Sequence, residues 1–413
     1  MVVVNKRKIV LFGAGKIGRS FIGPLFHKSG YELVFIDKDK SLVDELNRRQ
    51  KYKLIIKSDT SLIVHTITNL RGVCANDLNG VVDEVATAGI VTVAVGVNAV
   101  NSVIPLLAKG LLKRYQHHNK YPLDIIIAEN LRDGADHFRK GLLSFLPPDY
   151  PLDQLAGLIE TSIGKMVPIM QQKEMLDDKL QIFAEPYNTL ILDKKGFKNP
   201  IPVVEGLAPK DNIRAWVDRK LFVHNLGHAS IAYSGHLYNP AQTCMWEALQ
   251  NPEIYRYARN TMLQASLVLM DRYPDDFTYP ELEEHIDDLL SRFKNKALGD
   301  TIFRVGCDLG RKLSSNDRLA GAIKLAVESG LPYDKILFAL VCGCHFRAKD
   351  EDGNMFKDDI GFLDRFNTDI PLILKEISGF SANTDKQLIE EAEQIDREIK
   401  RFGFSEVIKK FCS

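Results

Sequence analysis

The chain contains 413 residues with 54 basic and 54 acidic side chains, so its formal net charge is zero. This balance argues against a nucleic acid or a membrane surface as the main partner. No apolar run of 18 residues occurs and no cleavable leader is expected, so we predict a cytoplasmic protein. The length exceeds that usually served by one hydrophobic core, so we expect two domains.

A strand, a glycine-rich turn and a helix are predicted at the start of the chain. The apolar run at 8–12 precedes the turn, and apolar positions at helical spacing follow it through residue 26. In such a unit the first glycine allows the tight turn, the second lets the backbone approach a pyrophosphate, and the third lets helix and strand pack closely. We therefore predict that a dinucleotide is bound by Gly13, Ala14, Gly15, Lys16, Ile17 and Gly18.

An acidic residue ends the second predicted strand, which covers residues 32–36. Asp37 stands nineteen residues after Gly18, where this motif places the acid that contacts the adenine ribose. A carboxylate there would repel the 2′-phosphate of NADP, so the sequence favours NAD. Lys38 and Lys40 weaken this preference without removing it.

Strands and helices alternate through the first half of the chain. Strands are predicted at 54–56, 90–95 and 123–128, with a helix at 100–112, which indicates a doubly wound parallel sheet of the Rossmann type. Ligands bind at the carboxyl ends of such strands. We therefore expect contacts with the cofactor or substrate from Val95, Gly96 and Asn130.

A first domain is expected at residues 1–205, with further strands between 158 and 199 and a turn rich in Gly, Pro and Lys before its end. The second domain, residues 206–413, is predicted to be almost entirely helical. Its expected helices lie at 212–236, 239–273, 280–294, 315–329, 333–346 and 385–400.

The first long helix of the second domain carries Lys220, Asn225 and His228 at offsets of five and three. In an α-helix these offsets correspond to about 140° and 60° of rotation, so the three side chains can share one broad face. A lysine beside apolar groups has a lowered pKa and can exchange a proton, and an asparagine amide can donate to a developing alkoxide. The triplet predicts metal-free chemistry on a carbon–oxygen bond; solvated or core side chains are the alternative interpretation of the spacing.

The six cysteines have no spacing typical of a disulfide framework, so reduced thiols are expected. The group Cys342, Cys344 and His345 invites interpretation as a metal site. It lacks a second pair of ligands and follows an apolar helical run, so buried thiols are favoured and no metal is predicted.

Nearly the whole chain resembles the polyol-specific long-chain dehydrogenases. A Lys-x4-Asn-x2-His element is the signature of that family, and Lys220, Asn225 and His228 match it. The resemblance is carried by residues 13–23, 93–96, 129–130, 219–229, 311–319 and 345–347. It implies a metal-independent, NAD-linked interconversion of a polyol and a ketose. It further implies Lys220 as the general acid and base, Asn130 and Asn225 as oxyanion-hole donors, and His228 as a contact of a substrate hydroxyl.

Two departures from the family pattern concern the substrate. Gly164 and Lys165 stand where the family carries Asp-Arg, so a hydroxyl contact is expected to be missing. Cys307 stands where members that act on mannitol 1-phosphate carry an arginine, and a cysteine cannot clamp a phosphate. Ion pairing within the fold is the alternative role for the substrate or phosphate contacts that we predict, which are Lys165, Arg304, Arg311, Lys312 and Arg347.

The resemblance makes mannitol 1-phosphate and fructose 6-phosphate the leading substrate pair. An unphosphorylated polyol or a hexonate is the close alternative. A regulatory protein that senses NAD without catalysis is a remote alternative, because a sensor has no need for the complete catalytic set. We expect a monomer or small homo-oligomer with a small-molecule partner.

Overall fold

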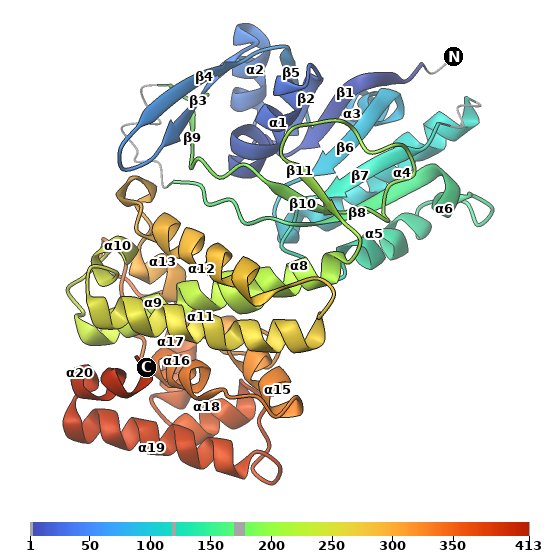
Figure 1. Ribbon diagram of the computed structural model, residues 1–413. Helices are drawn as coiled ribbons and strands as arrows, with labels where there is room; N and C mark the ends of the chain where they lie inside the picture. Colours follow the sequence, from blue (N-terminus) through green and yellow to red (C-terminus); the bar gives the residue numbers. More distant parts are fainter. Residues whose placement is uncertain (1–2, 118–120, 169–177, 413) are drawn as a thin grey trace. The chain divides into compact units, whose positions relative to one another are not determined.

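The computed structural model describes residues 3–117, 121–168 and 178–412, and the chain divides into two compact units, Met1–Val217 and Asp218–Ser413 (Figure 1). The division lies beyond the expected boundary at residue 205. The reason is that β11 (Leu207–Lys210) pairs with β10 (Leu190–Asp193) and so belongs to the sheet of the first unit.

In the described part of the chain, the first unit is built on an eight-stranded sheet with the order β11-β10-β8-β7-β6-β1-β2-β5. Its remaining strands are β1 (Asn5–Phe12), β2 (Glu32–Asp37), β5 (Leu70–Cys74), β6 (Ala88–Val93), β7 (Leu123–Ile127) and β8 (Ala156–Ser162). Neighbouring strands are parallel from β5 to β8, and β10 runs antiparallel to β8. The predicted Rossmann-type sheet is confirmed, with this antiparallel pair as an addition.

Both faces of the sheet are buried because successive side chains of a strand point in opposite directions. Ile9 and Leu11 belong to one apolar cluster, whereas Val10 and Phe12 belong to another. The helices of this unit are η1 (Gly18–Ile22), α1 (Gly23–Lys28), α2 (Lys40–Arg49), α3 (Leu78–Thr87), η2 (Val97–Ala99), α4 (Val100–Gln116), α5 (Gly134–Leu143) and α6 (Leu152–Leu155).

The strand predicted at 54–56 lies outside the main sheet. It is part of β3 (Tyr52–Lys57), which pairs antiparallel with β4 (Leu62–Ile67) and parallel with β9 (Ile182–Ala184) in a smaller sheet. Tyr52 is buried and Lys53 exposed, an alternation typical of a strand covered on one face rather than of a central parallel strand. The edge position beside β2 is taken by β5 instead.

The second unit is helical, as predicted. The helix α8 (Ile213–Arg219) crosses the division between the units and is described below with the two helical segments that follow it. The other described helices of the second unit are α10 (Met245–Ala248), α11 (Pro252–Arg272), α12 (Tyr279–Phe293), η4 (Lys296–Leu298), α13 (Ile302–Gly306), α14 (Leu309–Lys312), α15 (Ala320–Glu328), α16 (Asp334–Cys344), α17 (Lys357–Phe366), α18 (Ile370–Glu376), α19 (Lys386–Phe402), α20 (Phe404–Val407) and η5 (Ile408–Phe411). Within the ranges that the structure describes, no helix is both long and apolar enough to cross a membrane.

The prediction of one helix over 239–273 was wrong, because a new helix starts at Pro252. Proline is well accommodated in a first helical turn but not in a helix interior. Asn251 caps this start, and its side-chain oxygen accepts a hydrogen bond from the Glu253 amide at 2.7 Å. The helix predicted at 315–329 likewise begins only at Ala320.

Candidate active site

The glycine-rich turn joins β1 to a helix that begins at Lys16. Gly13 has a φ of +97°, and a Cβ there would lie 2.2 Å from the carbonyl oxygen of Ala94, so glycine is required. A Cβ on Gly18 would lie 2.1 Å from the carbonyl oxygen of Gly13, whereas a Cβ on Gly15 would meet no atom within 4 Å. The space at Gly15 therefore fits a pyrophosphate beside the amides of the first helical turn.

Alanine substitutions at these glycines are expected to separate folding from cofactor binding. Gly13→Ala should lower the free energy of unfolding by roughly 3 kcal/mol, because it combines backbone strain with a steric clash. Gly15→Ala should leave the melting temperature nearly unchanged but weaken NADH binding by about tenfold or more, because the methyl group occupies the open space. Thermal melts and fluorescence titrations measure the two effects, and an equal loss of stability in both variants would contradict the assignment.

Asp37 ends β2 beside the glycine turn. Its Oδ2 accepts a hydrogen bond from the Ala14 amide at 2.8 Å, and its Oδ1 accepts one from the Asp39 amide at 2.9 Å. Lys40 forms an ion pair with Asp44 at 2.6 Å. Part of the positive charge that could have attracted a 2′-phosphate is therefore neutralised within the helix α2.

Replacing Asp37 by serine is expected to reduce the preference for NAD over NADP by about tenfold or more, because a repulsive charge and a ribose hydrogen-bond acceptor are lost. Asp37→Asn is the matched control, since its amide oxygen can still accept from the Ala14 amide while the charge is removed. The ratio of kcat/KM values for the two cofactors measures the effect. An unchanged ratio in both variants would refute the placement of this carboxylate at the ribose.

A buried glutamate ties the carboxyl ends of β6 and β7 together. Glu129 Oε1 accepts hydrogen bonds from the amides of Val95 at 2.6 Å and Gly96 at 2.8 Å. Burial raises the pKa of Glu129, and the two amides partly oppose that rise. Gly96 has a φ of +88° with open space at its Cβ position, and Asn130 follows Glu129 on the surface. This edge is where parallel sheets bind ligands.

The helix that carries the catalytic candidates is not a regular α-helix. It consists of α8 (Ile213–Arg219), the π-helix η3 (Lys220–Asn225) and α9 (Leu226–Tyr238). A π-helix bonds residue i to residue i+5, so residues five apart are about one turn apart. The assumption of α-helical rotation was therefore wrong for this segment. In π-helical geometry Lys220 and Asn225 lie closer to a common face than they would in an α-helix.

Lys220 has an unusual pKa for a lysine. Burial, together with the positive charge of Arg318, lowers the pKa of Lys220 to about 8. Arg318 is fixed in place, because its Nε donates to Asp317 at 2.7 Å and its guanidinium donates to the carbonyl oxygen of Asn225 at 3.4 Å. A lysine with this pKa is present in both protonation states near neutral pH, so it can accept a proton and return it.

His228 faces a buried carboxylate. Its Nε2 lies 2.8 Å from Asp300 Oδ2, and its ring stacks on Phe293 with 4.5 Å between centroids and 4° between planes. Burial lowers the pKa of His228, although Asp300 opposes that effect. Burial would raise the pKa of Asp300, but His228 and Arg304 lower it overall. The arrangement thus holds a neutral imidazole against an ionised carboxylate at neutral pH.

Three of the predicted substrate contacts use their donors inside the fold. Each gives hydrogen bonds to main-chain carbonyl groups: Lys165 to Glu185 at 2.8 Å, Lys312 to Val305 at 2.6 Å, and Arg347 to Asn367 at 2.8 Å. Lys312 is buried, and burial lowers its pKa to about 8. These contacts stabilise the surrounding backbone.

The other two predicted contacts, Arg304 and Arg311, are more exposed. Arg311 forms ion pairs with Asp308 and Asp317. Arg304 Nε donates to Asp300 Oδ1 at 2.8 Å, while 53% of the Arg304 side chain remains exposed. Arg304 therefore shares one carboxylate with His228 and still presents part of its guanidinium to solvent.

Comparison with known families identifies two matching segments. A mannitol dehydrogenase Rossmann domain matches residues 7–206, and a mannitol dehydrogenase C-terminal domain matches residues 212–402. The chain belongs to the mannitol dehydrogenase family. It is an oxidoreductase of that family, and the predicted family and Rossmann fold are confirmed.

Solved structures give the same overall fold for this mannitol dehydrogenase family member. The chain is similar to a D-sorbitol dehydrogenase in substrate-free form, with 18% identity and a TM-score of 0.80 over 98% of this chain and 95% of the other. It is also similar to Pseudomonas fluorescens mannitol 2-dehydrogenase in a ternary complex with NAD and D-mannitol, with 17% identity and a TM-score of 0.74 over 98% and 94%.

The sequence analysis left out two side chains that shape the candidate site of this family member. Arg318 lies within the segments that carry the family resemblance, but a charged residue does not by itself reveal its partner. Asp300 lies outside those segments, and its partner His228 is far away in the chain. Only the packing of helices brings Asp300 and His228 together.

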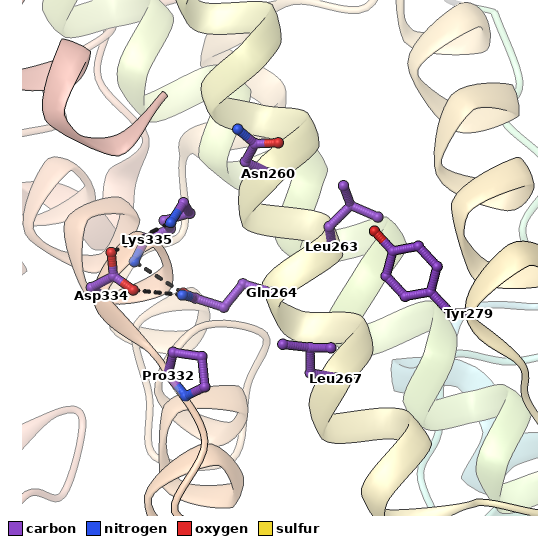
Figure 2. Close-up of a pocket in the computed structure, with 8 residues that line it drawn as sticks. All are labelled: Asn260, Leu263, Gln264, Leu267, Tyr279, Pro332, Asp334 and Lys335. Carbon is purple, nitrogen blue, oxygen red and sulfur yellow. Dashed lines mark hydrogen bonds and ion pairs between the residues drawn. The ribbon is translucent and has the colours of Figure 1, made fainter. Parts of the chain in front are cut away.

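A separate pocket of about 320 Å³ opens in the second unit between α11, α12 and the start of α16 (Figure 2). Gln264 donates to Asp334 at 2.6 Å and accepts from the Lys335 amide at 3.0 Å, so it caps α16. The pocket is lined by Asn260, Leu263, Gln264, Leu267, Tyr279, Pro332, Asp334 and Lys335, a set that includes none of the catalytic candidates.

Cys342 and Cys344 are buried in α16. Burial raises the pKa of both, to about 12 for Cys344, so both remain protonated thiols near neutral pH. Among the residues that the structure describes, no group of three or more His, Cys, Asp or Glu side chains is arranged to hold a metal ion.

Proposed function

We propose that this chain is an NAD-dependent dehydrogenase of a polyol phosphate, with mannitol 1-phosphate and fructose 6-phosphate as its substrate pair. Its activity would be that of a mannitol-1-phosphate 5-dehydrogenase. The observation that carries the dehydrogenase assignment is Lys220, whose pKa of about 8 and position on the π-helix η3 with Asn225 suit proton exchange with a substrate hydroxyl.

The proposed cofactor site lies on the first unit. The turn from Gly13 to Gly18 holds the pyrophosphate, Asp37 accepts from the adenine ribose, and Val95 and Gly96 line the edge nearest the nicotinamide end. The open space at Gly15 and the position of Asp37 beside the turn support this assignment. NAD, when bound, supplies hydride transfer, for which the side chains have no equivalent.

In the oxidation direction, neutral Lys220 accepts the proton of the reacting hydroxyl as the hydride leaves the carbinol carbon. Asn130 and Asn225 donate hydrogen bonds to the oxygen, which develops negative charge in the transition state. His228 contacts a neighbouring hydroxyl of the substrate and so fixes the orientation of the substrate's carbon skeleton. In the reduction direction, protonated Lys220 returns its proton to the carbonyl oxygen.

Arg304 is the proposed phosphate contact. Its guanidinium is oriented by Asp300 and is half exposed, which leaves N–H groups available to an oxyanion. The specific observation that favours the alternative, an unphosphorylated polyol or a hexonate, is the engagement of Lys165, Lys312 and Arg347 with backbone carbonyls. Both solved relatives are named for unphosphorylated polyols, which agrees with that alternative.

Initial rates of NADH oxidation with fructose 6-phosphate and, in parallel, with fructose separate these possibilities. The proposal expects a strong preference for the phosphate, and Arg304→Gln should then raise KM for fructose 6-phosphate while leaving KM for NADH unchanged. A preference for fructose would overturn the phosphate assignment and retain the reaction class. If the protein is inactive with both ketoses and with a panel of other ketose phosphates and ketohexonates, the proposed function is overturned.

The pH dependence of the two directions should differ in sign. Oxidation needs neutral Lys220, so kcat for the polyol should rise with pH and level off above about pH 8. Reduction needs protonated Lys220, so kcat for the ketose should fall as pH rises through the same region. Rates measured at saturating substrate between pH 6 and 10, in mixed buffers of constant ionic strength, test this expectation; parallel profiles would contradict it.

A further inference from the structure

We propose that Asp300 is a positioning residue, which holds His228 as the tautomer protonated on Nε2 and leaves Nδ1 to accept a hydrogen bond from a substrate hydroxyl. The inference rests on the proposed function, in which His228 contacts the substrate. It specifies that the substrate hydroxyl is the hydrogen-bond donor in that contact and Nδ1 the acceptor. A carbonyl or ether oxygen at the same position cannot donate, so it would not be accepted.

The geometry around His228 leaves the ring little freedom. Asp300 Oδ2 lies 2.8 Å from Nε2, and the stacked ring of Phe293 fixes the plane of the imidazole. The side chains of Asp300 and His228 are only 7% and 13% exposed. Because Nε2 is the ring nitrogen next to the carboxylate, Nδ1 is the one left for a ligand.

The backbone around Asp300 is also fixed. The carbonyl oxygen of Asp300 accepts from the Met245 amide at 2.9 Å, and the Ile302 amide donates to the carbonyl oxygen of Thr243 at 2.8 Å. Thr301 then caps α13, because its hydroxyl accepts from the Arg304 amide at 3.1 Å. These bonds fix the backbone at Asp300, and the hydrogen bond from Arg304 Nε to Asp300 Oδ1 restrains the carboxylate itself beside His228.

The tautomer follows from the donor and acceptor capacity of the groups. An ionised carboxylate only accepts hydrogen bonds, so the nitrogen that faces Asp300 must carry the proton. A neutral imidazole has one N–H, so its other nitrogen is an acceptor. The charged or titratable groups that act on this pair are His224, Arg304 and Arg318, and burial together with the two arginines favours neutral His228.

Asp300→Asn gives a sharp test because Arg304 can only donate. The amide oxygen of the new asparagine should face Arg304, so its NH2 group should face His228 Nε2 and move the ring proton to Nδ1. Nitrogen-15 NMR of histidine-labelled protein, with His228→Gln to assign the signal, reads this change directly. We expect the Nε2–H tautomer of His228 in the wild type and the Nδ1–H tautomer in Asp300→Asn. The Asp300→Glu variant should again show the Nε2–H tautomer.

Kinetics then connect the tautomer to the substrate. Asp300→Asn should raise KM for the ketose or polyol by about tenfold or more, with an unchanged dissociation constant for NADH. Asp396→Asn is the matched control, because Asp396 holds a second histidine, His345, at 2.8 Å in the same unit. That variant should leave KM unchanged.

Each outcome decides the inference. A wild-type His228 protonated on Nδ1 would overturn it without any variant, and so would a tautomer change in Asp300→Asn with wild-type KM. An increase in KM without a tautomer change would also overturn it and would assign the effect to Arg304. If the protein turns over none of the tested substrates, the proposed function fails, while the NMR result still judges the tautomer.

Discussion

Lys220→Ala is expected to lower kcat by about two to four orders of magnitude in both directions, because the variant has no group at this position to exchange the substrate proton. Dinucleotide binding should be largely intact, since the proposed cofactor contacts lie on the first unit. The melting temperature should change little, because burial disfavours the charged amine that is removed. Steady-state kinetics, NADH titration and a thermal melt measure the three quantities.

A matched control for this variant is Lys324→Ala. Lys324 lies on α15 in the same unit, its pKa is also lowered by burial, and it donates to the Ser315 hydroxyl. Its removal should leave kcat near the wild-type value. Wild-type turnover in Lys220→Ala would remove Lys220 from the mechanism, whereas a comparable loss in both variants would point to a general disturbance of the helical unit.

Asn225→Ala should lower kcat by about two to three orders of magnitude, the usual cost of removing one donor from an oxyanion site. Substrate binding should change much less than kcat, because the donor acts mainly on charge that develops in the transition state. Asn225→Asp has the same shape but places an acceptor beside the oxygen, so we expect an even larger loss. Initial rates at saturating and at low substrate separate kcat from KM.

Asn251→Ala provides the comparison for this second prediction. Asn251 caps α11, so its loss should lower the free energy of unfolding by about 1 kcal/mol without changing kcat. A fall in kcat for Asn225→Ala that is no larger than the fall for Asn251→Ala would exclude Asn225 as an oxyanion donor.

Local patterns were sufficient for the parts of the fold that depend on neighbouring residues. The strand, glycine turn and helix at 8–26 could be recognised from the spacing of the glycines and the apolar residues around them, although the contact that requires glycine at position 13 comes from Ala94, far along the chain. The helical second unit could be recognised from apolar spacing. The strand at 54–56 could be predicted as a strand but not assigned to its sheet, because its partners β4 and β9 lie at different distances along the chain.

The family, the glycine-rich turn and the Lys-x4-Asn-x2-His element could be recognised from residue type and spacing alone. The way the fold presents that element could not, since the π-helix η3 from Lys220 to Asn225 is a backbone geometry that the spacing does not encode. The environment of the side chains likewise depends on tertiary packing. Arg318 acts on Lys220 and Asp300 on His228 across long stretches of chain, and such electrostatic partners are chosen by helix packing rather than by any local pattern.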